Sequence, residues 1–168
     1  MIRCPDFCYR RWLWLTAFGL LLAAGVQAET ACPLELRQQS EGGSLVRLLV
    51  YEFEPGRFDL AMQVGEPATA IHRISHSGRD AQCAYQPLAL ERGGDWGWHL
   101  LWLEPGRGVY YARMDGDAWV SSPKKRLADD GVRQVRFRAD GSHLYVIWLD
   151  ADGRRQTRQS LDEGRSWD

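Results

Sequence analysis

The alternation of hydrophobic and polar positions predicts strands, and almost no helix, for most of this chain. The stretches from Leu34 to Arg37 and from Val132 to Arg138 alternate as half-buried strands do. Aromatic and aliphatic runs at Leu48–Phe53, His99–Leu103 and His143–Leu149 are typical of buried strands. No stretch after residue 28 keeps apolar residues at helical spacing. The pattern therefore predicts an all-β domain.

Three related units follow one another along the chain. The turn Glu54-Pro55-Gly56-Arg57 recurs as Glu104-Pro105-Gly106-Arg107, each time after a predicted strand. A looser third copy, at residues 150–154, follows the third strand. Each turn precedes a further strand-like segment, and these are Phe58–Val64, Val109–Met114 and Arg155–Ser160. A repeat of roughly 50 residues with several short strands is typical of β-propeller blades.

The length of the chain limits how many such units can form. Residues 29–168 provide for about three blades, whereas closed propellers usually have at least four. The predicted fold is therefore a small or incomplete β-propeller-like assembly of about three blade-like units. We expect the strand around Leu34 to cover the outer edge of the last unit, because an unpaired edge invites aggregation.

A turn motif lies near residue 168. The string Ser160-Leu161-Asp162-Glu163-Gly164-Arg165-Ser166-Trp167 resembles the Asp-box repeat of sialidase-type propellers. In that motif the Ser and Asp side chains bond backbone amides, the Gly adopts a positive φ and the Trp packs beneath the turn. The resemblance implies a structural hairpin in a blade, not a catalytic site. A degenerate copy runs from Met114 to Trp119.

The first 28 residues resemble a secretory signal. A basic start with Arg3, Arg10 and Arg11 precedes the apolar run Trp12–Ala24 and the small-residue site Val26-Gln27-Ala28. That run is short for a bilayer span, so an uncleaved anchor is the less favoured alternative. We expect a cleaved signal at 1–28, a single domain at 29–168 and a periplasmic location. No membrane association is expected after cleavage.

Charge and cysteine content narrow the possible functions. The formal net charge is −1, with no concentrated basic face of the kind that nucleic-acid binding requires. Two cysteines lie after residue 28, Cys32 and Cys83, and an oxidising compartment favours a disulfide between them. A catalytic thiol is the alternative, but no His stands in a recognisable signature.

Catalytic and cofactor sites are not predicted from the residues present. Three units cannot bring the arginine cluster, the tyrosine and the acid of a sialidase together in one pocket. The glutamates, such as Glu104, fit turn or surface roles better than the roles of a general acid–base pair. His72 and His76 lack a visible third metal ligand. Aspartates such as Asp150 are explained by turn chemistry, although calcium in these turns stays open.

The segment from Trp119 to Arg126 combines small hydroxyls, a proline and cations. Ser121 and Ser122 precede Pro123, and the cations Lys124, Lys125 and Arg126 follow. We interpret it as a protruding, stiffened loop suited to enter a partner's cleft, with the cations steering approach. The alternative is a plain connection into the next blade.

The signal, the all-β pattern, the size and the Ser-Ser segment together resemble the periplasmic immunity proteins that neutralise a type VI-secreted peptidoglycan amidase, a papain-like cysteine hydrolase. In that family a loop with small hydroxyl residues contacts the catalytic Cys and His, and Ser121 and Ser122 are the matching residues. The resemblance implies a protein partner, no cofactor and no enzymatic activity. The alternatives are a carbohydrate- or cell-wall-binding module using Trp96 or Trp98, and an unassigned periplasmic assembly factor.

Overall fold

The computed structural model describes residues 35–39, 43–94 and 97–168. Their secondary structure is strand apart from one short 3-10 turn, η1 (Gln82–Ala84), which confirms the all-β prediction. The predicted signal at 1–28, Cys32 and Trp96 lie outside the described residues. Within the part that is described, no helix has the length and hydropathy to span a bilayer.

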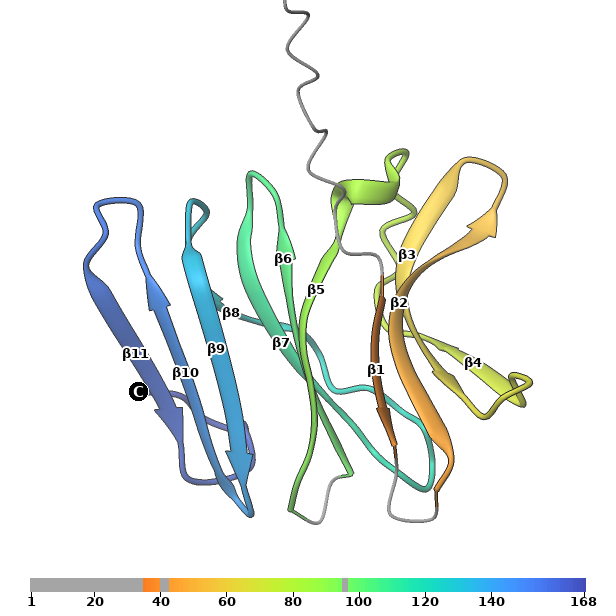
Figure 1. Cartoon of the computed structure of the whole chain (residues 1–168). Helices are drawn as coiled ribbons and strands as arrows, with labels where there is room; N and C mark the ends of the chain where they lie inside the picture. The colour runs from red at the N-terminus through yellow and green to blue at the C-terminus, as the bar shows by residue number, and fades with distance from the viewer. Residues whose placement is uncertain (1–34, 40–42, 95–96) are drawn as a thin grey trace, which may run out of the picture. The chain divides into compact units, whose positions relative to one another are not determined.

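Three antiparallel sheets, each built from consecutive strands, make up the domain (Figure 1). Sheet 1 holds β1 (Glu35–Gln39), β2 (Leu45–Glu54), β3 (Arg57–Val64) and β4 (Ala70–Arg73). Sheet 2 holds β5 (Gln86–Arg92), β6 (Trp98–Glu104), β7 (Gly108–Met114) and β8 (Lys125–Ala128). Sheet 3 holds β9 (Arg133–Asp140), β10 (His143–Leu149) and β11 (Arg155–Ser160). The predicted incomplete assembly of three blade-like units is thus present.

The repeated turns are the hairpins that join the second and third strands of each sheet. They connect β2 to β3, β6 to β7 and β10 to β11. Gly56 has a φ of +69°, Gly106 of +75° and Gly153 of +80°. Glycine enters this left-handed region without the steric cost that a Cβ would bring, so the repeat places it where each turn needs it.

Sheet 2 is buried on both faces. Trp98, Leu100 and Trp102 of β6 pack with β2 and β3 in one hydrophobic cluster. Leu101, on the opposite face of β6, packs with Leu144, Val146 and Trp148 of β10 and other residues in a second cluster. A strand that is buried on both sides loses the alternation of a half-buried one, which explains the continuous apolar run of β6.

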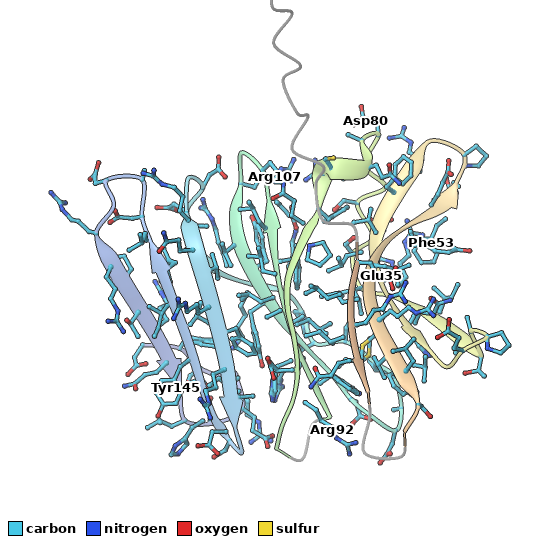
Figure 2. The ribbon with its side chains drawn as sticks, in the orientation of Figure 1. Glu35, Phe53, Asp80, Arg92, Arg107 and Tyr145 are labelled. Carbon is cyan, nitrogen blue, oxygen red and sulfur yellow. The ribbon has the colours of Figure 1, made fainter. Side chains whose placement is uncertain are left out.

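Sheet 3 keeps that alternation. The β10 residues Leu144, Val146 and Trp148 are buried toward sheet 2. Tyr145 lies between Leu144 and Val146, is only partly buried, and is labelled on this sheet in Figure 2. Sheet 3 therefore contributes one face to the core.

The prediction that the N-terminal strand covers the last unit is wrong for the described residues. β1 pairs with β2 of sheet 1, with Glu35 opposite Leu49 and Gln39 opposite Leu45. A strand that is only a few residues from its neighbour closes a short loop, whereas pairing with β11 would require closure over most of the chain. The local hairpin is therefore the less costly arrangement.

A buried histidine links sheets 2 and 3. His99 of β6 is fully buried, and its Nδ1 lies 2.7 Å from the Tyr111 hydroxyl while its Nε2 lies 3.2 Å from the Gly93 carbonyl oxygen. The Tyr111 hydroxyl also lies 3.2 Å from the carbonyl oxygen of Glu163, in the turn after β11. Burial is the main cause that lowers the pKa of His99 to about 4, and the charge of Arg113 lowers it further.

Stability should therefore fall as the pH drops from about 6.5 to about 4. In this window His99 gains a proton in the unfolded state but stays neutral in the folded state. The unfolding free energy at about pH 4 is therefore lower by about 3 kcal/mol than above pH 6.5. Urea unfolding at several pH values should show a shallower loss in His99→Gln than in the wild type. Identical slopes would contradict a neutral buried His99.

The disulfide between Cys32 and Cys83 stays a prediction. Cys83 lies on the exposed turn η1, and Cys32 lies outside the described residues. A bridge would hold the N-terminal segment to the start of sheet 2 and stabilise the domain by about 3–4 kcal/mol in the chain-entropy estimate. Thiol titration of unreduced, denatured protein without the signal should find no free sulfhydryl, and two reactive thiols would refute the pairing.

Candidate functional site

The segment with the two serines lies along the outer edge of β7 and does not protrude from it. Ser121 forms an isolated bridge with Met114. The Ser122 amide donates to the Arg113 carbonyl at 2.8 Å, and the Arg113 amide donates to the Ser122 hydroxyl at 3.0 Å. The expectation of a projecting loop is thus corrected, because pairing of this segment satisfies backbone groups that β7 would otherwise leave open.

A capped turn leads into this segment. The Asp115 carboxylate accepts hydrogen bonds from the amides of Asp117 at 2.9 Å and Ala118 at 2.6 Å, and these bonds lower its pKa. Trp119 then adopts a φ of +54° and stacks on His72 of β4, with the ring centroids 5.1 Å apart. After this turn the side chain of Val120 is 65% exposed.

The three cations of the segment are each engaged within the protein. Lys124 Nζ lies 2.6 Å from Glu104 Oε1 and 4.3 Å from the centroid of the Tyr110 ring. Lys125 Nζ donates to the backbone carbonyl of Arg165. Arg126 forms an exposed ion pair of 2.9 Å with Asp129. They do not form the free cationic patch that steering of a partner would use.

Glu104 holds one side of this region. Its carboxylate is 1% exposed and, besides the Lys124 ammonium, accepts bonds from the Trp102 indole at 3.2 Å and from the Arg79 guanidinium at 3.4 Å. The surface role expected for this glutamate is therefore wrong, whereas its turn role is present, since the Glu104 carbonyl accepts from the Arg107 amide at 2.9 Å. Glu54 occupies the same position in the first copy of the repeated turn and is exposed, so the turn sequence does not reveal which glutamate is buried. Glu104 is buried because sheet 2 is covered on both faces.

Asp59 holds the opposite side in the same way. Its carboxylate is fully buried on β3 and forms an ion pair with Arg73 at the end of β4. It also accepts bonds from the Ser75 hydroxyl at 2.7 Å, the Tyr85 hydroxyl at 3.1 Å and the amides of Ser77 and Gly78 at 3.0 Å. Burial alone would raise the pKa of Asp59, but the bonds from Ser75, Arg73 and Gly78 outweigh it and the pKa is lowered.

These two anchored segments enclose a shallow groove. It has a volume of about 380 Å³ and runs between residues 74–77 on one side and residues 121–124 on the other. His76, Ser77 and Ser121 bring an imidazole and two hydroxyls to it, and its lining contains no carboxylate or thiol. This set of groups can donate and accept hydrogen bonds, which suits binding better than proton transfer.

The predicted Asp-box string folds as a tight capped turn after β11. The Gly164 amide donates to the Ser160 hydroxyl at 2.8 Å, and the Ser166 amide donates to the Asp162 carboxylate at 2.8 Å. Gly164 has a φ of +77°, and Trp167 packs edge-to-face on Tyr111 with the centroids 4.9 Å apart. After the turn the chain returns beside β11, where the Asp168 amide donates to the Gln159 carbonyl at 3.1 Å, and the turn packs sheet 3 against sheet 2.

The other candidates from the sequence have structural roles where they are described. Trp98 is 3% exposed in the core, which removes one of the two tryptophans expected to stack on a sugar. The Asp150 carboxylate accepts from the amides of Asp152 and Arg154 and from the Gln156 side chain, as a turn residue does. No cluster of potential metal ligands occurs among the residues that the structure describes.

Comparison with protein families, curated proteins and solved structures finds no match for this chain. The features of the described residues that bear on function are the groove and the segment from Val120 to Lys124.

Replacing Glu104 by Gln should loosen that segment. The change leaves the Lys124 ammonium beside a neutral amide and removes the charge that also holds Arg79, so we expect a loss of about 3 kcal/mol in unfolding free energy. Faster exchange of the Ser122 amide should accompany it. Glu54→Gln, at the equivalent but exposed turn position, is the control and should change stability by less than about 0.5 kcal/mol. Equal effects of the two variants would contradict the anchoring role.

Proposed function

We propose that this chain is an exported immunity-type protein that binds a secreted peptidoglycan amidase and blocks its active-site cleft with the surface from Val120 to Lys124. The observation that carries the proposal is a preformed contact segment. Ser122 is bonded to β7, Lys124 is paired with buried Glu104, and Val120 between the turn and Ser121 is 65% exposed.

Preformed geometry matters because binding must offset the entropy lost on ordering a contact surface. A segment already held by β7 and Glu104 loses little further freedom when a partner docks. Pro123 is exposed and adds stiffness to the same stretch. Exposed Val120 supplies an apolar anchor beside the polar groove, an arrangement that favours a protein partner.

The two serines have different roles in this proposal. Both serines are partly exposed and line the groove, but only the Ser122 hydroxyl is bonded to β7, so the Ser121 hydroxyl is the one available to the partner. Ser122 accepts from the Arg113 amide and keeps the segment in place. The partner's cleft would therefore close over a ridge and groove, in place of an inserted loop, and Ser121 would meet its catalytic polar groups.

The glycan-binding alternative has no observation in its favour. Trp98 is buried, and Trp96 lies outside the described residues. The described groove presents hydroxyls, the His76 imidazole and the Lys124 side chain, and its lining contains no Trp, Tyr or Phe ring that could stack on a sugar.

An inhibition assay tests whether the surface from Val120 to Lys124 contacts the amidase. With a papain-like peptidoglycan amidase encoded in the same genome, Val120→Asp and Ser121→Glu should each weaken inhibition at least about thirtyfold, the scale of an interface hot spot. Leu161→Asp, which charges a side chain of similar exposure (61%) on the turn after β11, is the matched control and should inhibit like the wild type. Calorimetry gives the dissociation constants.

Ser122→Ala provides an internal check on the division of roles. It should lower stability by about 1–2 kcal/mol through the unpaired Arg113 amide, with a smaller loss of inhibition than Ser121→Glu. Unaltered inhibition by both Val120→Asp and Ser121→Glu would remove this surface from the mechanism. Binding to peptidoglycan fragments, with no effect on the amidase, would favour the glycan-binding alternative.

A further inference from the structure

The face of sheet 3 that points away from sheet 2 carries its side chains in three columns. Paired residues of an antiparallel ladder share a face, so the register fixes which side chains lie together. The central column, on β10, is apolar and consists of Tyr145, Ile147 and Leu149. All three are partly exposed, and none belongs to the two hydrophobic clusters. Tyr145 is labelled on this sheet in Figure 2.

The column on β9 is cationic. It consists of the exposed arginines that lie opposite the three apolar residues, which are Arg138, Arg136 and Arg133. The register shifts between Arg136 and Arg133, where Gln134 adopts a φ of +52°. Without this bulge, regular alternation would turn Arg133 toward sheet 2. A left-handed backbone is unfavourable for glutamine, and its effect here is to place a third guanidinium on the outward face.

The column on β11 adds a cation on the other side of the apolar residues. Its members are Gln159, Thr157 and Arg155, and Arg155 is exposed opposite Leu149. The apolar column of β10 is therefore flanked by guanidinium groups on both sides.

These arginines are not balanced by carboxylates on the same face. The chain has 21 Lys and Arg and 22 Asp and Glu, but Asp140 is the one carboxylate at the outward positions of these described strands. Burial raises the pKa of Glu91 on β5 and the charge of Arg138 opposes that rise, so Glu91 offsets part of this charge. Arg133 donates to the neutral carbonyl of Ala151 at 2.7 Å. No ion pair of Arg136 or Arg155 occurs among the described residues.

The width of the apolar column decides which kind of element fits over it. A sheet face is covered either by a helix or by another sheet. A second sheet would need a broad apolar area, whereas both columns beside β10 are polar. A helix with one apolar stripe needs only a narrow column, and its diameter of about 10 Å spans three strands that lie about 4.8 Å apart. Packing against the same face of a second copy would bring arginines together, which is unfavourable.

We propose that the outward face of sheet 3 binds an acidic amphipathic helix of another protein. The apolar stripe of the helix covers Tyr145 and Ile147, and carboxylates on its flanks pair with Arg136 on one side and Arg155 on the other. A protein fits better than a phosphate or sugar polyanion, because a polyanion would leave the apolar column uncovered. This surface shares no residue with the segment from Val120 to Lys124, and the proposal does not depend on the proposed function.

A face that simply meets water is the competing explanation. One face of an antiparallel sheet is commonly solvated, and arginine is usually exposed. That explanation accounts for the exposure of these residues. It does not account for three arginines in one column, which repel one another, or for the left-handed Gln134 that brings in the third. It predicts that acidic and basic helices bind equally poorly.

Binding of a synthetic helix tests the proposal. The probe is an end-blocked peptide of about 18 residues, or roughly five helical turns, with one stripe of leucines, glutamates on both flanks and alanine elsewhere. It is titrated into the mature domain, residues 29–168, and followed by NMR. We expect the amides of Tyr145 and Ile147 to shift and the amide of Ser122 to stay in place. A peptide with lysines in place of the glutamates should bind at least about tenfold more weakly.

Three variants of the protein locate the contact. Arg136→Glu should weaken the glutamate peptide at least about tenfold and strengthen the lysine peptide. Arg158→Glu is the matched control, because it makes the same change of charge at an exposed arginine of this sheet that lies opposite inward-facing Val146. It should bind the glutamate peptide like the wild type. Ile147→Thr keeps a β-branched side chain and should weaken both peptides, and Arg136→Glu provides the test if this variant fails to fold.

Four outcomes would overturn the proposal. The first is unmoved Tyr145 and Ile147 amides at millimolar glutamate peptide. The second is equal loss of affinity in Arg136→Glu and Arg158→Glu. The third is binding of unstructured polyglutamate or of inorganic polyphosphate as tight as that of the helix, because the face would then select charge without shape. The fourth is dimerisation in sedimentation experiments that Ile147→Thr abolishes, because a second copy would then be the occupant.

Discussion

The buried carboxylate of Asp59 is the interaction on which the rest of the first half of this domain depends. The stretch from Arg73 to Tyr85 forms only short pieces of regular structure, so its polar groups need partners from elsewhere. Asp59 accepts bonds from a guanidinium, two hydroxyls and two amides of this stretch. A buried charge is costly unless it is paired and hydrogen-bonded, and five donors offset that cost. One side chain thus fixes a segment that apolar packing alone would leave undetermined.

Glu104 repeats this arrangement on sheet 2, and together the two carboxylates explain why the groove between residues 74–77 and 121–124 is preformed. Each lies on a buried strand and holds a segment that contributes little to the apolar core. Arg79 connects the two systems, because it follows the Asp59-bound amide of Gly78 and donates to Glu104. Disturbing either carboxylate should therefore move both walls of the groove.

The sequence predicts the strands well because their signals are local. Repeated turns with glycine, apolar runs and the capped turn at Ser160 each depend on a few neighbouring residues. It fails where the outcome depends on distant pairing, as for β1, which joins β2 instead of the last sheet. It also misses the structural roles of Asp59 and Glu104. A single acidic residue in a strand or turn sequence does not reveal the five donors that bond to Asp59 or the lysine that pairs with Glu104, because these come from other segments of the chain. An aspartate in an otherwise apolar strand was the only available signal.

The Ser-Ser segment shows why a residue type in a favourable pattern does not settle its role. From the sequence both serines look equally available to a partner, but pairing with β7 uses the Ser122 hydroxyl and leaves Ser121 facing the groove. The same pairing places three cations against Glu104, the Arg165 carbonyl and Asp129. The segment is thus a fixed surface whose cations are already paired, and not a mobile cationic loop. Its recognition of a partner would depend on shape and on exposed Val120 more than on long-range electrostatic attraction.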